Sequence, residues 1–579
     1  MNKSGFFRRS ELTGALWAFR FEFMVVGLFS MIINVMMLAP TIYMLQLFDR
    51  VMASRSELTL LAVSLITLFL FGVMAISEWT RSRILVRAGL RFDAHLGTRV
   101  FNASFESSLS QSTVSPTRAF SDLITLRQFI TGSGVFAFFD APWAPIYIGV
   151  TFFLHPLLGW LSLVFAVIQA ALAWFGHRHA VRPAQIAAQA GSDVNVYLQS
   201  KLRNAEVIES MGMLGSLRKR WRVWQNEYLS QSANSHHASG RVMAWSKFIR
   251  YTQQSLALAA GAVLVINGEM SPGAMIATNV LMSRALAPID QLVGVWNSFS
   301  GAKAAFSRLE QLLAEYPESD PNLSRVAPQG EVTLRQVVAD APGRATPILK
   351  EVGFTTAPGT VTIIVGPSGS GKSTLARVMM GIWPDVSGEV LLDGLPIQGW
   401  DRMELGPHLG YLPQDIELFE GSIGENIARF GELDSEKVIE AARCAGLHEM
   451  ILRFPKGYDT PIGEAGNLLS GGQRQRIGLA RAVYGDPAVL VLDEPNSNLD
   501  DAGETALIKT VLQLKAKGKT VFLITHRPSA VAVADRILIL QDGRIVADGP
   551  RDAVLASLRP QAAAQHEPPT PAVGMAQPA

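Results

Sequence analysis

The feature that most constrains this chain is a series of long apolar runs in roughly its first half. Residues 23–48 contain no charged side chain, and residues 58–77 form a second run of the same kind. About 20 mostly apolar residues cross the ~30 Å hydrocarbon core of a bilayer, so these runs favour membrane spans over the buried helices of a soluble core. Six spans are predicted, over residues 23–48, 58–78, 135–154, 157–176, 245–267 and 273–301.

The loops between these spans differ in charge. Residues 1–20, 81–133 and 177–242 carry 20 Lys or Arg side chains between them, whereas the opposite loops carry only Arg50 and Arg55. Because cytoplasmic loops are enriched in Lys and Arg, both termini and both long loops are predicted to be cytoplasmic.

The two long loops also show the apolar spacing of helices, as at Val194, Leu198 and Leu202. We therefore expect the spans to continue into the cytoplasm as long helical extensions. The predicted organisation is a cytoplasmic N-terminal segment, residues 1–22, followed by an all-α six-helix transmembrane domain, residues 23–311.

Composition agrees with a chain that is half membrane-bound and half soluble. Charged residues make up 17% of the chain and the mean hydropathy is +0.22, which argues against an ordinary cytosolic enzyme and against a disordered protein. The net charge of +2 gives no electrostatic case for a nucleic-acid partner. Cys444 is the single cysteine, so the chain has no intrachain disulfide and no cysteine-based metal site.

The second half of the chain has the composition of a soluble α/β domain. A polar, proline-containing linker is predicted over residues 312–330, before a nucleotide-binding domain over residues 331–559. Residues 560–579 contain five Pro and six Ala, which indicates a disordered tail.

The soluble half contains a phosphate-binding loop in its proper context. The β-branched run of residues 361–365 predicts a strand, and the pattern G-x-x-x-x-G-K-[ST] follows it directly. Glycines let backbone N–H groups turn toward phosphate oxygens, and the next helix adds the positive end of its dipole. Lys372 would contact the β- and γ-phosphates of ATP, and the Ser373 hydroxyl would bind Mg²⁺. The candidate loop comprises Gly366, Pro367, Ser368, Gly369, Ser370, Gly371, Lys372, Ser373 and Thr374.

A second apolar strand, residues 488–492, ends in two acids, Asp493 and Glu494. Neighbouring side chains on a strand point to opposite faces, so two separate roles fit this pair better than one shared role. Asp493 is the candidate ligand for Mg²⁺, and Glu494 is the candidate for polarising the attacking water.

Between these elements lies the sequence Leu-Ser-Gly-Gly-Gln, which resembles the signature of ATP-binding cassette transporters. Gln414, Asp500 and His526 fall in the order of the other motifs of that family. The resemblance is strong over about residues 325–560, and the six preceding spans with long extensions resemble its exporters. The signature residues are Leu469, Ser470, Gly471, Gly472 and Gln473.

The resemblance implies a role for each of these residues. Two cassettes of a homodimer would pair head to tail, with ATP between the phosphate loop of one copy and residues 470–473 of the other. Glu494 would be the catalytic base, Gln414 would sense Mg²⁺ and the attacking water, and His526 would hold the γ-phosphate. Asp500 would couple the two sites, and Glu464 would touch the cytoplasmic loops of the second copy.

One departure from the family concerns adenine. Related cassettes stack adenine on an aromatic side chain upstream of the phosphate loop, but residues 331–353 contain no Phe, Tyr, Trp or His. Adenine would rest on an aliphatic side chain or on an arginine such as Arg344, or be held loosely.

A finer resemblance is to type I secretion transporters of Gram-negative bacteria, which export metalloproteases and lipases. Residues 140–147, 381–384 and 410–419 carry it. It implies a multi-pass protein of the bacterial inner membrane that exports a protein with an uncleaved C-terminal signal by alternating access. The implied partners are a periplasmic membrane-fusion adaptor and an outer-membrane channel.

Two other readings remain open at this point. The same ATP-driven machinery could export a lipid or small molecule, in which case an apolar cavity open to lipid is expected. A non-transporting ATPase with a membrane anchor is disfavoured by Gln414 and by the six spans with their extensions. Charges inside the spans suggest either functional sites, or else satisfied interhelical pairs or positions at the water boundary. The pair or boundary position is favoured for Asp140 and pathway lining for Arg284, with Asp290 open.

Overall fold

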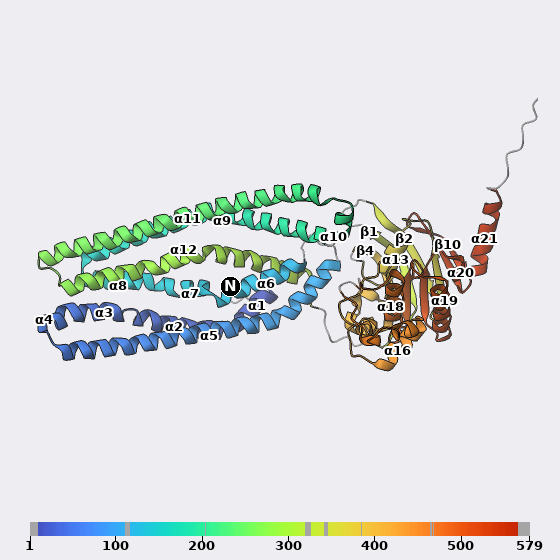
Figure 1. Ribbon diagram of the computed structural model, residues 1–579, viewed down its shortest axis with the longest axis horizontal. Helices are drawn as coiled ribbons and strands as arrows, with labels where there is room; N and C mark the ends of the chain where they lie inside the picture. Colours follow the sequence, from blue (N-terminus) through green and yellow to red (C-terminus); the bar gives the residue numbers. More distant parts are fainter. Residues whose placement is uncertain are drawn as a thin grey trace, which may run out of the picture. The chain divides into compact units, whose positions relative to one another are not determined.

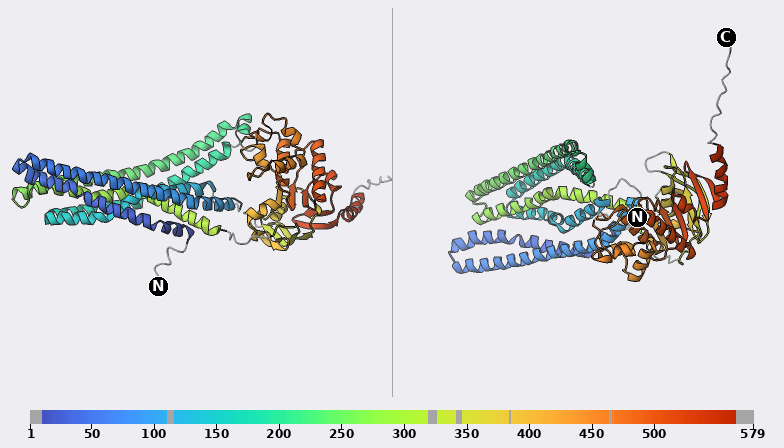
Figure 2. Two further views of the ribbon diagram at one scale, coloured as in Figure 1. Left: turned by 90° about the horizontal axis from the view of Figure 1, so that it is seen from below. Right: turned by 45° about the vertical axis from the view of Figure 1, so that its right-hand side comes forward.

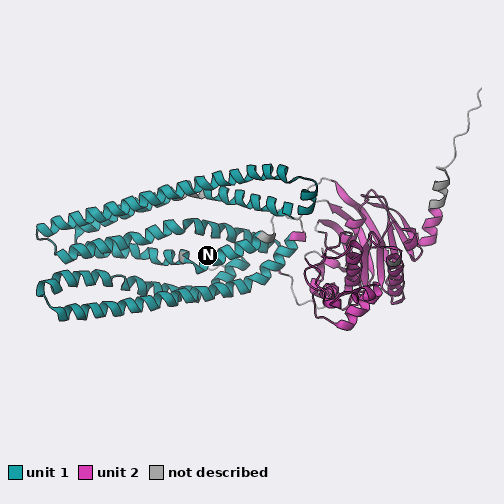
Figure 3. Ribbon diagram, viewed as in Figure 1, with its two compact units in different colours: residues 1–107, 114–317 teal, residues 108–113, 318–579 magenta. Residues whose placement is uncertain are grey.

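The computed structural model forms two compact units. Unit 1 comprises residues 1–107 and 114–317, and unit 2 comprises residues 108–113 and 318–579 (Figure 3). The division at Pro317 lies inside the predicted linker. The structure describes residues 10–109, 116–202, 204–318, 326–340, 346–383, 385–463, 466 and 468–564.

Unit 1 is made of helices, the longest of which run side by side (Figures 1 and 2). The α5 helix contains 53 residues, which at 1.5 Å per residue is about 80 Å, far more than a bilayer requires. The helices are α1 (Glu11–Ala18), α2 (Arg20–Met36), α3 (Ala39–Gln46), the π-helix η1 (Leu47–Val51), α4 (Met52–Ser54), α5 (Glu57–Leu109), α6 (Pro116–Thr131), α7 (Ser133–Asp140), η2 (Ala141–Trp143), α8 (Ala144–Leu154), α9 (Pro156–Leu202), α10 (Ala205–Ser210), α11 (Leu214–Ile266) and α12 (Pro272–Glu315).

Four stretches of the described chain are long and apolar enough to cross a membrane, namely Arg20–Ser54, Glu57–Leu109, Arg118–Leu154 and Pro156–Gly176. None of the most apolar window of Glu57–Leu109 is buried inside the protein, so its side chains are free to face lipid. The two remaining predicted spans, 245–267 and 273–301, lie in α11 and α12, which do not meet this criterion. The count of six spans therefore stays a prediction.

The first span is not a single helix. The α2 helix ends at Met36 and α3 begins at Ala39, with Pro40 in its first turn. A proline has no backbone N–H and its ring clashes with a preceding helical carbonyl, so it fits best in the first turn of a helix. The run of apolar residues predicted the crossing but not this interruption.

One end of unit 1 is held by a core shared between α1, α5, α6 and α12. Arg99 of α5 lies in this core: its guanidinium pairs with Glu11 at 3.1 Å and donates to the Leu313 carbonyl at 3.3 Å and to the Tyr316 carbonyl. The last carbonyls of a helix have no partner within it, so Arg99 caps α12. The core side chains are Leu12, Ala15, Phe92, Leu96, Val100, Ala103, Ala119, Leu123, Leu126, Ile130, Ala302, Leu309, Leu312 and Leu313.

Unit 2 contains two sheets. An antiparallel sheet has the order β2-β1-β4-β5, and a six-stranded sheet has the order β10-β9-β3-β8-β7-β6, parallel except for β10. The strands are β1 (Val332–Asp340), β2 (Pro347–Thr356), β3 (Val361–Val365), β4 (Val386–Leu392), β5 (Leu395–Pro396), β6 (Leu409–Leu412), β7 (Val489–Asp493), β8 (Thr520–Ile524), β9 (Arg536–Gln541) and β10 (Arg544–Pro550).

Helices cover both faces of the parallel sheet (Figure 1). Alternate residues of the central strands enter two different hydrophobic clusters, as parallel sheets with covered faces require. The helices are α13 (Lys372–Met379), η3 (Ile397–Gly399), α14 (Arg402–Leu405), η4 (Gly406–His408), α15 (Ile423–Ile427), α16 (Ser435–Cys444), α17 (His448–Ile451), η5 (Gly457–Asp459), α18 (Gly471–Val483), α19 (Asp501–Ala516), α20 (Pro528–Val531) and α21 (Arg551–Ala564).

The architecture confirms the predicted fold class, a helical transmembrane domain with long extensions followed by an α/β cassette, apart from the number of spans. Two boundaries differ from the prediction. The α12 helix runs to Glu315, into the predicted linker, because Leu312 and Leu313 are buried in the core of unit 1. The α21 helix runs to Ala564, into the predicted tail, where three consecutive alanines favour helix.

Candidate nucleotide-binding site

The phosphate-binding loop joins β3 to α13, as the sequence predicts. Gly369 and Gly371 have φ angles of +79° and +100°, in the left-handed region that favours glycine. A Cβ on Gly366 would overlap the Leu540 carbonyl oxygen of the neighbouring strand. Glycine therefore fits Gly369 and Gly371 because of their backbone conformation, and Gly366 because the Leu540 carbonyl leaves no room for a side chain.

Lys372 starts α13 and is buried, with 7% of the residue exposed. Its Nζ donates to the carbonyl oxygens of Gly366 at 2.8 Å and Pro367 at 2.9 Å. Burial lowers the pKa of Lys372, while Glu494 and Asp493 act in the opposite direction. The Lys372 ammonium group thus bonds to the first two residues of the loop that would surround a phosphate.

Asp493 ends β7 and is 1% exposed. Burial raises its pKa, and a hydrogen bond from Ser373 opposes this shift. Its Oδ1 atom and the Ser370 hydroxyl are buried and have no hydrogen-bond partner among the described residues. A buried carboxylate oxygen of this kind, on a side chain that also accepts from the Ser373 hydroxyl, fits the oxygen ligands that Mg²⁺ prefers.

The described residues offer few protein ligands for this metal. The described residues contain no group of three His, Cys, Asp or Glu side chains placed to bind an ion. Mg²⁺ commonly uses one or two protein oxygens together with phosphate oxygens, so Ser373 and Asp493 are candidate ligands for a Mg²⁺ ion bound together with nucleotide.

Glu494 lies where three strand ends meet. Its Oε2 accepts from Gln414 Nε2 at 3.2 Å, and its Oε1 lies 3.8 Å from His526 Nε2. Gln414 follows β6 and His526 follows β8, and the carboxyl ends of parallel strands share one edge of the sheet. The structure therefore brings together the three residues predicted to be catalytic, although they are far apart in the sequence.

The signature residues form the start of α18. Ser470 is the N-cap: its hydroxyl accepts from Gln473 N at 3.3 Å, while the Gln473 side chain accepts from Ser470 N at 2.8 Å. This capping box fixes the first turn, in which Gly471 and Gly472 leave the backbone N–H groups uncovered. The N-terminus of α18 is therefore a suitable place for a phosphate oxygen.

The signature and the phosphate loop belong to opposite faces of the parallel sheet. Leu375 and Ala376 of α13 pack in one hydrophobic cluster, and Ile477 and Leu479 of α18 pack in the other. Ser470 is exposed. This arrangement agrees with a signature that serves the nucleotide of a second copy.

Asp500 is the N-cap of α19, where its carboxylate accepts from Gly503 N at 2.9 Å. It also pairs with Arg476 of α18 at 2.5 Å. The backbone bond to Gly503 holds the pKa of Asp500 below its usual value, with Arg476 adding to the effect. Sequence reasoning did not assign a role to Arg476 or to its neighbour Gln475, whose amide reaches the backbone of Glu494.

Two predicted contacts lie outside the described residues. Glu464, expected to touch the second copy, and Arg344, offered as a support for adenine, are among them.

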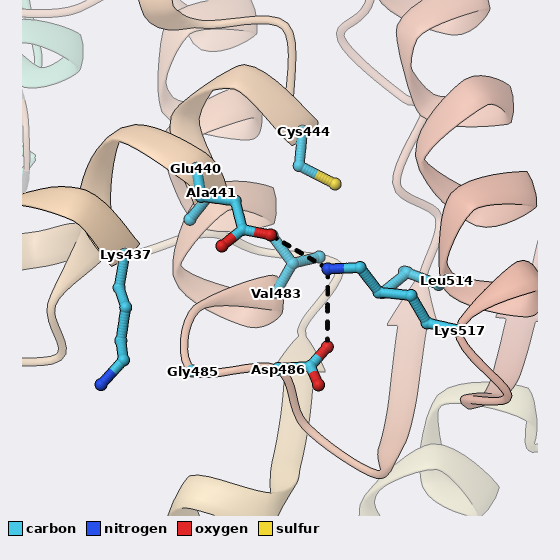
Figure 4. A pocket seen from close by; sticks show the side chains of 9 residues that line it. All are labelled: Lys437, Glu440, Ala441, Cys444, Val483, Gly485, Asp486, Leu514 and Lys517. Carbon is cyan, nitrogen blue, oxygen red and sulfur yellow. Dashed lines mark hydrogen bonds and ion pairs between the residues drawn. The ribbon is translucent and has the colours of Figure 1, made fainter.

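A pocket shown in Figure 4 lies away from these motifs, between α16 and α19. Lys517 crosses it and pairs with Glu440 at 3.0 Å and Asp486 at 3.8 Å. The hydrogen bond that Lys517 donates to Glu440 raises the pKa of Lys517, and burial raises the pKa of the Cys444 thiol. These contacts tie the two helices together, and no nucleotide motif lines the pocket.

Charged residues of the predicted spans have partners in unit 1. Asp140 pairs with Arg81 at 3.3 Å and accepts from Asn34 at 2.8 Å, so it is an interhelical pair. Asp290 pairs with Arg250 at 3.4 Å. Arg284 donates to the Met37 sulfur at 3.2 Å, a weak acceptor.

Comparison with known proteins agrees with the site and the fold. The protein-family model described as "ABC transporter transmembrane region" matches residues 23–288, and the family model described as "ABC transporter" matches residues 349–497. The type I secretion system ATP-binding protein PrsD of Rhizobium meliloti is 41% identical over 557 residues, which is 96% of each chain. This chain is an ABC exporter. It is a membrane-integral protein that binds nucleotide and hydrolyses ATP to drive transport.

Other relatives of the ABC exporter have related names. The toxin RTX-I translocation ATP-binding protein of Actinobacillus pleuropneumoniae is 30% identical, over 92% of this chain and 76% of that protein. Relatives named for type I secretion and toxin translocation place this exporter among the ATP-driven protein exporters. The solved structure of a bacterial Atm1-family ABC exporter with ATP bound has a TM-score of 0.81 and covers 96% of this chain and 99% of that one. At 23% identity that structure supports the fold alone.

Proposed function

We propose that this ABC exporter is the ATPase of a type I secretion system, exporting an unfolded protein with a C-terminal signal across the bacterial inner membrane. The observation that carries the proposal is the 41% identity to a type I secretion ATP-binding protein over 96% of both chains. Its partners would be a periplasmic membrane-fusion adaptor and an outer-membrane channel. Both termini and the cassette would be cytoplasmic, as the charge of the loops indicates.

The nucleotide site supports a defined division of labour. The loop of residues 366–374 and Lys372 would bind the phosphates of ATP. Mg²⁺, held by Ser373, Gln414 and Asp493, would neutralise phosphate charge. Glu494 would take a proton from the attacking water, Gln414 would orient that water, and His526 would hold the γ-phosphate.

Two copies would form a homodimer with two such sites. Residues 470–473 of one copy would complete the phosphate loop of the other, with Asp500 coupling the sites. ATP would bind more tightly when the cassettes are closed, and this difference in affinity would drive the change in access across the membrane.

The role of Glu494 is tested by Glu494→Gln, which keeps the size of the side chain but removes the base. We expect hydrolysis to fall by about 10²–10⁴-fold, the range of general-base effects, while ATP binding is retained. Phosphate release and binding of a fluorescent ATP analogue by the purified full chain measure the two properties. A variant that hydrolyses ATP at the normal rate would show that Glu494 is not the base.

The cargo is tested by comparing culture-medium proteins from cells with the native chain and cells with Lys372→Ala. One or a few proteins without N-terminal signals should disappear from the medium of the mutant. Lys437→Ala is the control because it removes an exposed lysine of the same cassette, whose ion pair among the described residues is with Asp434. An unchanged medium, with the chain expressed, would instead support the export of a lipid or small molecule.

A further inference from the structure

The backbone of Glu494 has an unusual conformation. Its φ angle is +48°, in the left-handed region that non-glycine residues rarely adopt. Such a conformation costs free energy and persists only when surrounding contacts maintain it. Here it turns the chain at the end of β7, so that the carboxylate faces Gln414 and His526.

Among the described residues, three hydrogen bonds hold the backbone N–H and carbonyl of Glu494. Glu494 N donates to the Ile524 carbonyl at 2.9 Å, and the Glu494 carbonyl accepts from Ser497 N at 3.2 Å. The third donor is the side-chain amide of Gln475, which lies 3.3 Å from the same carbonyl oxygen. Two of the three bonds are backbone bonds, so Gln475 is the side chain through which another element reaches the peptide of Glu494.

Gln475 is 1% exposed and comes from α18. A buried amide is retained only where it is hydrogen-bonded, since burying an unpaired polar group is unfavourable. The same helix begins at Ser470 and its two glycines. The helix that carries the signature, α18, therefore also hydrogen-bonds to the backbone of Glu494, just after the end of β7.

We propose that Gln475 is a positioning residue for ATP hydrolysis. Its amide holds the peptide of Glu494 in the left-handed conformation and keeps the carboxylate aimed at the attacking water. The proposal rests on the proposed role of Glu494 as base. Under the proposed pairing of two copies, α18 would meet one nucleotide at Ser470 and set the base of the other at Gln475.

The geometry predicts which kinetic constant changes. Gln475 touches neither the phosphate loop nor Lys372 among the contacts of the described residues, so its loss leaves the ATP-binding groups in place. A small rotation of the Glu494 peptide moves its carboxylate away from both neighbours, and a misplacement of about 1 Å can lower a rate by about 100-fold. We therefore expect a lower kcat with an unchanged KM for ATP.

The first test uses the purified full chain with Gln475→Met, which keeps the length of the side chain but removes the donor. We expect kcat to fall about tenfold or more and KM to stay within about twofold. Thr510→Val is the matched control: Thr510 is 0% exposed, and its hydroxyl donates to the Ala506 carbonyl at 2.8 Å on α19, away from the nucleotide motifs. The control should lower thermal stability to a similar degree and leave kcat unchanged.

A second variant gives a signature that a general loss of stability would not produce. Gln475→Glu has a donor only when its carboxyl is protonated, whereas Gln475→Met never has one. The kcat of Gln475→Glu divided by the kcat of Gln475→Met should therefore rise as pH falls. A ratio that does not change with pH overturns the proposal, including in the case where Gln475→Met folds poorly.

The failure of this inference is distinguishable from failure of the proposed function. If Glu494→Gln hydrolyses ATP normally, the assignment of the base is wrong and the inference falls with it. If Glu494→Gln is inactive but Gln475→Met retains its kcat, the base is right and the positioning role of Gln475 is wrong.

Discussion

Asp493 and Lys372 carry opposite charges in a site that removes both from water. Burial raises the pKa of the carboxyl and lowers the pKa of the ammonium, so it disfavours the charged form of each group. Each shift is partly offset by the other group. A bound cation beside Asp493 and bound phosphates beside Lys372 would restore the charged forms, so the residues present match the charges of Mg²⁺ and ATP.

The raised pKa of Asp493 predicts how Mg²⁺ affinity depends on pH. Protons compete with Mg²⁺ at pH values where an exposed aspartate is already ionised, so the apparent affinity should weaken as pH falls. The loss should approach about tenfold per pH unit below the raised pKa. Mg²⁺ titrations of ATP-analogue binding between pH 5 and pH 8 measure it, with Asp493→Asn as control for the titration of ATP itself. Identical pH profiles for the two proteins would contradict the prediction.

The loop glycines provide a second prediction at this scale. Gly366→Ala should destabilise the cassette by about 1–3 kcal/mol and abolish nucleotide binding, because its Cβ would overlap the Leu540 carbonyl. Gly406→Ala is the control: no atom lies within 4 Å of its added Cβ and its φ is negative. Thermal unfolding and nucleotide binding compare them. Equal effects of the two substitutions would show that the close approach at Gly366 is unimportant.

At the scale of elements, the end of α12 depends on its contacts with α1, α5 and α6. Arg99 joins three of these helices, since it caps the last carbonyls of α12 and pairs with Glu11 of α1. Arg308 of α12 pairs with Asp122 of α6 at 2.5 Å. These contacts hold the last helical turns before the chain enters the second unit.

Replacing Arg99 should loosen this region. Arg99→Met keeps an apolar side chain in the core but removes the donors to the α12 carbonyls, each charge-assisted bond contributing about 1.5–3 kcal/mol. We expect faster hydrogen exchange at residues 11–18 and 309–316. Arg91→Met is the control because the Arg91 side chain is 73% exposed and its ion pair among the described residues, with Glu22 at 3.6 Å, is a type that contributes about 0–1 kcal/mol. Equal exchange in the two variants would exclude the capping role of Arg99.

At the scale of the whole molecule, the proposed sites need two copies of the chain. The helix after the phosphate loop, α13, and the signature helix, α18, pack on opposite faces of one sheet, which keeps the two motifs apart within one chain and is compatible with the proposed head-to-tail pairing. If two copies form each site, two chains with different defects should restore one site between them. A site formed within one chain would not allow this.

Two inactive chains should complement each other. Lys372→Ala removes the phosphate contact and Ser470→Arg blocks the signature, so neither homodimer has an intact site. A mixed dimer has one site made of the normal Lys372 of one copy and the normal Ser470 of the other. Co-purification of differently tagged chains should yield dimers that bind ATP, measured by trapping in the Glu494→Gln background. No binding by the mixed dimer would indicate that both motifs act within one chain.

The nucleotide motifs and the membrane character could be predicted from the sequence because each depends on neighbouring residues. The loop of residues 366–374 needs glycines at fixed local positions, and an uncharged run of 26 residues predicts a span by its length alone. The same reasoning did not find the break between α2 and α3. It also predicted spans in α11 and α12, whose apolar content does not by itself show that they cross the membrane.

The contacts between distant residues required the tertiary structure. Gln475 and Glu494 are 19 positions apart, and Arg99 and Leu313 are 214 apart, so no spacing rule relates them. Motif order predicted Gln414 and His526 as members of the site. Their meeting at Glu494 depends on the order of β6, β7 and β8 in the sheet. Local sequence specifies a loop or a helix because the contacts that form it join neighbouring residues. A hydrogen bond between distant elements exists only after packing has brought their strands and helices together.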